Sequence, residues 1–326
     1  MARVGKRSGR NFGFGRQLSY AGPQALKYLF GDGHFATVKA HSDRWQAFVR
    51  WCRSEEGPRL YDARQIDREI LMRYATYVRG LVDQGKVGIA TAQNRLSSLN
   101  RTMAALRGDQ YVKIPSPSKA LCLQRSGVRS DAPQGQDRVQ VEQVARALSE
   151  RGQQRVSAIV HLTRETGMRL REAILADLPR LQREARQLAK INIQDGTKGG
   201  RSGASAQRWI AVTDQVRDAL YRASEASPNG SRNLLAPDES YKVFLQTVVR
   251  PARDILHEQG LKGFHELRAA YACERYEQLT GFSAPVNGGR GHREDRELDR
   301  QARQQISHEL GHNRIDVVSA YIGGRR

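Results

Sequence analysis

A segment that contains proline, glycine and serine divides the chain into two stretches with helical periodicity. Residues 114–137 include Pro115, Pro117 and Pro133, and no regular apolar spacing continues through them. This composition interrupts helices and strands and is typical of a linker. At 326 residues the chain also exceeds the usual size of one domain. The sequence therefore predicts two folded domains.

Residues 21–113 are expected to form a small helical domain. Apolar side chains recur there at the spacing of one helix face, in stripes formed by Trp45, Phe48, Val49 and Cys52, by Ile70, Leu71, Tyr74 and Val78, and by Leu96, Leu99, Met103 and Leu106. Residues 1–20 have five basic and no acidic residues. Because this composition of basic residues and glycines does not favour a core, the segment is predicted to be a flexible basic arm.

Residues 138–326 are expected to form the second domain. Helical patterns begin near Val139, and two short runs rich in β-branched and aromatic residues, INIQDGTKGG and QRWIAV, predict a β-hairpin between helices. Residues 280–300 are too polar and glycine-rich for a core, which favours a loop. The expected fold class is mainly α with a small antiparallel β-sheet, an α+β arrangement in this domain.

The charge of the chain indicates an anionic partner. Lys and Arg exceed Asp and Glu by 54 to 34, a formal net charge of +20. Basic residues that neutralise phosphates release counterions, so this excess favours nucleic acid. A basic protein kept soluble by its charge is the alternative. Three widely separated cysteines favour reduced thiols, and the absence of a long apolar run favours a cytoplasmic protein.

Two basic clusters in the second domain carry candidate chemistry. Arg169 lies in TGMRLREAILADL, and GFHELRAAYACERY places His265 and Arg268 three residues apart. Residues at this spacing share a helix face. Two arginines from different segments can hold one tetrahedral phosphate with forked donors.

These clusters, together with TKGG and LGHNRIDVVSAYIG, resemble the catalytic motifs of the tyrosine recombinase or phage integrase family. The family order is Arg, hairpin Lys, His-x-x-Arg, then Gly-His followed nine residues later by Tyr. In this chain His312 is followed nine residues later by Tyr321. The resemblance covers about residues 138–326 and implies a C-shaped clamp of two domains around duplex DNA.

The resemblance implies a role for each matched residue. Arg169, Arg268 and His312 would stabilise the charge that develops on a phosphate without a metal ion. Glu172, three residues after Arg169, would help to hold the arginines.

Tyr321 would be the nucleophile that forms a 3′-phosphotyrosyl bond. Since tyrosine ionises only near pH 10, roughly, His265 is the candidate base, and Lys198 in the expected hairpin would protonate the leaving 5′ hydroxyl. The link conserves the energy of the phosphodiester, so strands can be rejoined without ATP, metal or another cofactor.

The family likeness also implies partners. They are double-stranded DNA, three further copies of the chain in a synaptic homotetramer, and accessory proteins that set direction or bend DNA, with no membrane. The expected activity is site-specific integration or excision of a mobile element, in the cytoplasm and near the nucleoid.

Three alternatives remain open in the sequence. HELGH at residues 308–312 satisfies H-E-x-x-H, in which two histidines bind zinc and Glu309 acts as the base, although a third ligand is then required. A DNA-binding protein of the same fold that does not cut DNA is the second alternative. In the third, Tyr271 or Tyr276 replaces Tyr321 as nucleophile, although their apolar neighbours favour core packing.

One departure from the family pattern is the spacing between Arg268 and His312, which are 44 positions apart. The excess falls in residues 280–300 and indicates an insertion. Its arginines and glycines are suited to contact with DNA or a neighbouring subunit, and a solvated loop is the alternative.

Overall fold

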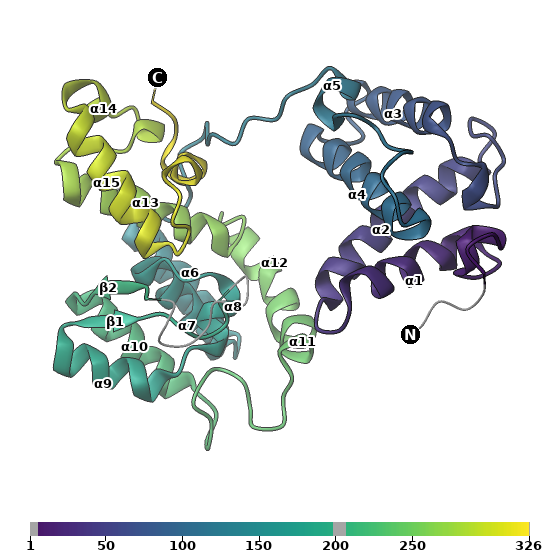
Figure 1. Ribbon diagram of the computed structural model, residues 1–326. Coiled ribbons are helices and arrows are strands. Elements are labelled where there is room, and N and C mark those ends of the chain that lie inside the picture. Colours follow the sequence, from purple (N-terminus) through teal and green to yellow (C-terminus); the bar gives the residue numbers. More distant parts are fainter. Residues whose placement is uncertain (1–5, 198–206, 326) are drawn as a thin grey trace. The chain divides into compact units, whose positions relative to one another are not determined.

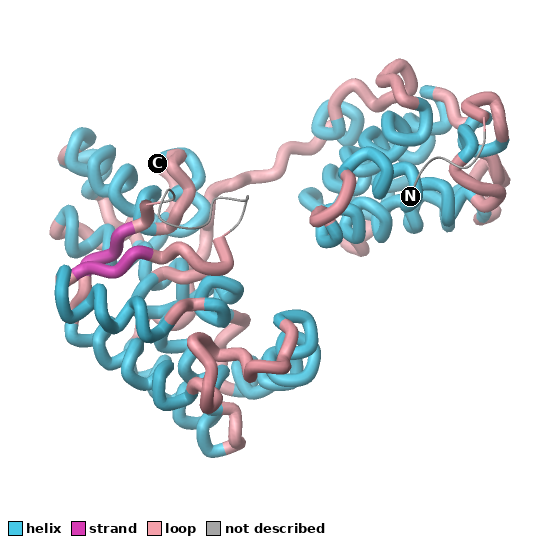
Figure 2. Tube along the Cα trace, turned by 60° about the horizontal axis from the view of Figure 1, so that its bottom comes forward, coloured by secondary structure: helices cyan, strands magenta, loops and turns pink. Residues whose placement is uncertain are grey.

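The protein was analysed as a computed structural model that describes residues 6–197 and 207–325 (Figure 1). Two compact units divide the chain, Met1–Arg125 and Ser126–Arg326. Both are helical, and the described residues form one two-stranded antiparallel sheet, which lies in the second unit (Figure 2). The predicted fold class is therefore confirmed. None of the helices in the described ranges has the length and apolar character needed to cross a bilayer.

The first unit is built from helices alone within its described part. Its elements are η1 (Arg10–Gly13), α1 (Leu18–Phe30), α2 (Phe35–Arg53), η2 (Ala63–Gln65), α3 (Arg68–Asp83), α4 (Ile89–Arg107) and α5 (Pro117–Leu121). The predicted apolar stripes face its core, where Trp45, Phe48 and Tyr74 are at most 1% exposed. Their rings pack in tilted and edge-on contacts, which aromatic pairs favour.

The prediction of a flexible arm over residues 1–20 differs from the structure in residues 6–20. Asn11 is fully buried in a left-handed backbone conformation, and its side chain accepts a hydrogen bond from Ala63 N at 2.7 Å and donates to Gly15 O at 2.8 Å. Asp62 accepts from the Asn11 backbone N–H. Asn11 anchors this segment together with Phe14 and Leu18, which are buried in the core of the unit. The segment before α1 is too short for a helical period, so periodicity did not reveal it.

The predicted linker, residues 114–137, is also partly folded. Ile114 and Leu121 are buried in the core of the first unit, and Ser116 caps α5. The division between the units falls after Arg125. Short segments of this kind lack enough repeats of the helical period to be recognised in sequence.

The second unit holds one small sheet among many helices. Its elements are α6 (Arg138–Glu150), α7 (Gln154–Thr166), α8 (Leu170–Leu175), α9 (Leu178–Leu188), β1 (Lys190–Asn192), β2 (Trp209–Ala211), α10 (Asp214–Ala226), α11 (Tyr241–Phe244), η3 (Leu245–Val249), α12 (Arg250–Glu258), α13 (Phe264–Thr280), η4 (Pro285–Asn287), α14 (Gly291–Glu294), α15 (Arg296–Glu309), η5 (Ile315–Val318) and α16 (Ser319–Ile322). The strands pair antiparallel with Ile191 opposite Ile210, and both side chains enter the core, as expected for the predicted hairpin.

A separate apolar cluster joins α13, α15 and α16 at the carboxyl end of the described chain. Ala272, Ile306, Leu310, Tyr321 and Ile322 are buried in it. Burial of these side chains packs α16, a helix of four residues, against α13 and α15. Because an isolated helix of this length is unstable in water, the cluster fixes its position.

Residues 280–300 are more ordered than the predicted loop. They contain η4, α14 and the start of α15, and Ala284 and Asp299 are buried. The Asp299 carboxylate accepts hydrogen bonds from Arg303 Nε at 2.9 Å and Tyr276 Oη at 2.9 Å. A paired carboxylate can be buried, so the polar composition of this region did not exclude it from the core.

Replacing Asn11 with alanine is expected to lower the free energy of unfolding by about 2–4 kcal/mol, because it leaves buried backbone groups without partners and places alanine at a positive φ. Urea unfolding followed by tryptophan fluorescence measures this, since Trp45 and Trp51 lie in the core of the same unit. The exposed Gln110→Ala variant is the control. An unchanged midpoint for Asn11→Ala would contradict the anchoring role.

Candidate active site

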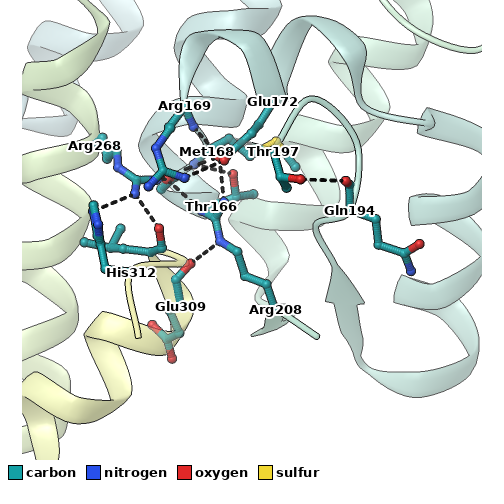
Figure 3. Close-up of polar contacts among 12 residues, drawn as sticks. Thr166, Met168, Arg169, Glu172, Gln194, Thr197, Arg208, Arg268, Glu309 and His312 are labelled. Atoms are coloured by element: carbon teal, nitrogen blue, oxygen red, sulfur yellow. Dashed lines mark hydrogen bonds and ion pairs between the residues drawn. The ribbon is translucent and has the colours of Figure 1, made fainter. Parts of the chain in front are cut away.

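Five predicted residues gather in the second unit from segments that are distant in sequence. Arg169 directly precedes α8, His265 and Arg268 lie in the first turns of α13, His312 follows α15, and Tyr321 lies in α16. Figure 3 shows Arg169, Arg268 and His312 grouped around one region. Lys198 lies outside the described residues.

Gly167 explains why the first motif needs a glycine. It ends α7 in a left-handed conformation (φ 63°), and a Cβ there would lie 2.6 Å from Tyr271. The turn leaves the Gly167 carbonyl to accept hydrogen bonds from Arg268 and from Arg208, the latter at 3.1 Å. The chain turn therefore orients two arginines.

Glu172 is fully buried and lies among arginines. Its carboxylate accepts from Arg169 NH1 at 2.6 Å, Arg169 N at 2.7 Å and Arg208 NH1 at 2.6 Å, with Arg268 NH1 at 3.8 Å. Burial alone would raise the pKa of Glu172, but these charges, that of Arg208 foremost, lower it to about 2. Glu172 is thus ionised at neutral pH.

Arg268 is 1% exposed and directed toward Tyr321. Its Nε lies 3.4 Å from Tyr321 Oη, while its other nitrogens donate to Gly167 O and, at 2.5 Å, to Leu310 O. Burial, followed by the charge of Arg208, lowers the pKa of Arg268 to about 10. Arg268 therefore keeps its positive charge at pH 7.

Two histidines flank the Tyr321 ring. His312 Nε2 lies 2.8 Å from Tyr321 Oη, and the His265 ring centroid lies 5.2 Å from that of Tyr321. Burial and then the charges of Arg268, Arg169 and Arg208 lower the pKa of His312 to about 4. In the protein without DNA, His312 is therefore neutral at pH 7 and can accept the tyrosine proton, in contrast to the cationic role implied by the family resemblance.

His265 keeps an exposed side chain beside Tyr321. Partial burial of its ring, followed by the charges of Arg268 and Arg129, lowers the pKa of His265. It is therefore neutral at pH 7 and chemically suited to accept a proton. Its ring lies tilted against that of Tyr321, whereas His312 is within hydrogen-bond distance of the Tyr321 hydroxyl.

The segment that carries Tyr321 is held by a buried ion pair on α15. Arg303 pairs with Asp299 and donates to Ser319 Oγ and Gly323 O, both at 3.2 Å. Arg325 Nε also donates to Asp299, at 2.7 Å. These contacts bracket Tyr321 on both sides in sequence.

Arg208 is the site residue that motif reasoning missed. It is 4% exposed, immediately precedes β2 and bonds Glu172 and Gly167. Its sequence context, QRWIAV, indicated only a strand. The available signal was an arginine at the edge of an apolar strand, and arginine is seldom buried unless paired.

The HELGH segment does not form a continuous helical zinc motif. Helix α15 ends at Glu309, before His312, and His308 is exposed. The Glu309 carboxylate accepts from Tyr271 Oη at 2.8 Å and Arg275 Nε at 3.1 Å, and the described residues contain no group of three acidic, histidine or cysteine side chains placed to hold a metal ion. The zinc alternative is therefore not supported.

Solved integrase structures have the same fold as this chain. A lambda integrase dimer bound to a COC′ core site matches with a TM-score of 0.55 at 16% identity, covering 92% of this chain and 93% of that one. A Tn1549 transposon integrase in complex with transposon right end DNA matches with a TM-score of 0.57 at 13% identity, covering 91% and 93%. A lambda integrase tetramer bound to a Holliday junction has a TM-score of 0.51 at 17% identity, covering 89% and 72%.

The sequence gives a family assignment for part of the second unit. Residues 127–274 match the family model described as Integrase. A search of curated protein sequences found no match. This segment is thus similar to the integrase family, in agreement with the resemblance inferred from the motifs. The matched segment includes Arg169, His265 and Arg268 and ends before His312 and Tyr321.

Gly167→Ala is expected to lower the free energy of unfolding by about 2–4 kcal/mol, because the positive φ and the contact with Tyr271 both oppose a methyl group. Gly152→Ala is a matched control, since Gly152 also has a positive φ (74°) but nothing lies within 4 Å of a Cβ added there. Urea unfolding followed by circular dichroism compares them. Equal losses of unfolding free energy in the two variants would show that the close contact with Tyr271 contributes nothing to the effect.

Proposed function

We propose that this protein is a site-specific DNA recombinase that cleaves and rejoins DNA through a 3′-phosphotyrosyl bond to Tyr321. The observation that carries the proposal is the position of Tyr321 Oη, 2.8 Å from His312 Nε2 and 3.4 Å from Arg268 Nε. A tyrosine hydroxyl beside a proton acceptor and a fixed cation is suited to attack a phosphodiester.

In the proposed cleavage, Tyr321 Oη attacks the phosphorus, the bond to the 5′ oxygen breaks, and a 3′-phosphotyrosyl bond forms. Arg268 and Arg169 stabilise the charge on the phosphate oxygens, and Arg169 is 27% exposed at its side chain, which leaves it accessible to DNA. The phenol proton passes to His312 or His265.

Lys198, proposed from the family resemblance, gives the leaving 5′ oxygen its proton. Attack by a 5′ hydroxyl from another strand reverses these steps, returns the proton to Tyr321 and joins the strands. The phosphodiester energy is conserved, so the proposed reaction needs no ATP, metal ion or other cofactor.

Charge and structural likeness support double-stranded DNA as the substrate. The net charge is +20, and the similar lambda and Tn1549 integrases were solved with DNA. In the first unit, Arg44 and Arg101 lie near His41 on α2 and α4, which gives these helices a basic face suited to phosphate contacts.

Assembly is proposed by analogy. Lambda integrase forms a dimer on a core site and a tetramer on a Holliday junction. We propose that four copies of this chain likewise act on two DNA duplexes, integrating or excising a mobile element, with accessory proteins that set direction or bend DNA.

Wild-type protein is expected to form a covalent adduct with a nicked duplex taken from the DNA that flanks its gene, whereas Tyr321→Phe is not. A denaturing gel of labelled DNA detects the adduct. An adduct with both proteins would place the nucleophile elsewhere. The third possible outcome is tight, salt-dependent binding of the flanking DNA without any adduct. That outcome would favour a DNA-binding protein that does not cut.

Arg169→Ala is expected to slow adduct formation by about 1,000-fold, since it removes a donor to the transition-state charge. DNA affinity is expected to change by less than about threefold, because other basic residues supply most of the counterion release. Exposed Arg146→Ala on α6 removes the same charge and is the control. Parallel losses of affinity and cleavage in Arg169→Ala would contradict a role in chemistry.

A further inference from the structure

Arg208 lies inside the candidate active site without reaching its surface. Each guanidinium nitrogen has a protein acceptor: Nε donates to Glu309 O at 2.5 Å, NH1 to Glu172 Oε2 at 2.6 Å, and NH2 to Gly167 O at 3.1 Å (Figure 3). The residue is 4% exposed. None of these partners is Tyr321 or His312, so Arg208, unlike Arg268, is not placed at the tyrosine hydroxyl.

Arg208 and Arg268 share several acceptors. Both donate to Gly167 O, and both lie near Glu172 Oε2, Arg208 at 2.6 Å and Arg268 at 3.8 Å. Each also donates to a carbonyl at the end of α15, those of Glu309 and Leu310. Arg208 thus occupies the position closer to the carboxylate.

Because Arg208 is closer to Glu172 than Arg268 is, Arg268 can stay beside Tyr321. A buried carboxylate requires a close cationic partner, and Arg208 provides it for Glu172. Arg268 consequently keeps its Nε 3.4 Å from Tyr321 Oη. Without Arg208, Glu172 Oε2 would keep only the Arg169 backbone N–H as a close donor, and its uncompensated charge would attract Arg268 away from Tyr321.

Arg208 also joins two other parts of the site. Its backbone N–H donates to Asn192 Oδ1 at 2.9 Å, and its carbonyl accepts from Ile193 N at 3.0 Å, so it belongs to the hairpin. A Cβ at Gly311 would lie 3.1 Å from Arg208 Cδ. Because Gly311, the residue before His312, has no side chain, it leaves room for the side chain of Arg208.

We infer that Arg208 is a positioning residue for DNA cleavage: it neutralises Glu172 together with Arg169, which leaves Arg268 directed at Tyr321, and it fixes the hairpin against the turn before His312. This inference rests on the proposed recombinase function. It assigns Arg208 to the cleavage step and not to DNA binding.

Arg208→Met is expected to slow covalent adduct formation by about 100-fold, the size of effect that a displacement of about 1 Å in an active site can produce. DNA affinity should stay within about twofold of that of Arg146→Met, which removes an equal charge from an exposed position. Arg208→Lys keeps the charge without the forked donors and should recover part of the rate. Equal cleavage by Arg208→Met and Arg146→Met would overturn the inference.

The double variant Arg208→Met/Glu172→Gln tests whether Arg208 acts through Glu172. If it does, the double variant cleaves no more slowly than Arg208→Met, because the two changes interrupt one interaction. Losses that multiply those of Arg208→Met and Glu172→Gln would show that Arg208 acts independently of Glu172 and would overturn the inference.

Thermal unfolding tests the same pair without any cleavage assay. The charged groups facing Glu172 are Arg169 before α8, Arg208 before β2 and Arg268 on α13, and the titratable His312 after α15 also faces it. Burial raises the pKa of Glu172 and these arginines lower it, Arg208 most of all. Removing Arg208 therefore raises the pKa and leaves a poorly compensated buried carboxylate at pH 7.

The double variant should consequently melt above Arg208→Met at pH 7, and the difference should narrow as the pH falls and Glu172 becomes protonated. Equal melting temperatures at pH 7 would overturn the inference. Because this readout needs no DNA, it tests the pairing of Arg208 with Glu172 separately from the recombinase proposal, whose failure would appear as the absence of an adduct with wild-type protein. If Arg208→Met does not fold, Arg208→Lys is compared with Arg208→Lys/Glu172→Gln in the same way.

Discussion

The buried carboxylate of Glu172 is the interaction on which the candidate active site depends. Isolated in the protein interior it would be strongly unfavourable, and it is stable because Arg169, Arg208 and Arg268 surround it. One negative charge among three arginines leaves a positive excess next to Tyr321. A phosphodiester undergoing substitution gains negative charge in the same place, so the arrangement is suited to stabilise it.

The neighbouring helices bring the tyrosine to that charge. Helix α16 is short and depends on the apolar cluster of α13 and α15 and on the buried pair of Asp299 and Arg303. The turn after α15 places His312 at the tyrosine hydroxyl. Low pKa values keep both histidines beside Tyr321 neutral at pH 7, so they can accept a proton where the arginines cannot.

The integrase similarity and the geometry of the site are separate lines of support for the proposed function. The family match covers residues 127–274, and the fold likeness extends over most of the chain. Neither identifies Tyr321 or His312 as functional. Their roles are implied by the motif resemblance and supported by distances within this chain. Residues 280–300 contribute to the site directly, because Asp299 helps to hold the segment that carries the tyrosine.

Sequence alone determined the two-part organisation, the helical fold with one hairpin and the motif positions, because apolar periodicity and residue spacing are local properties of the chain. It missed the folding of residues 6–20, where Asn11 bonds a segment about fifty positions away, and the burial of Asp299. It also gave no sign of Arg208, whose role comes from Glu172, Gly167 and Glu309. Only the tertiary structure decided these features, since the stability of a buried polar group depends on partners that are distant in sequence.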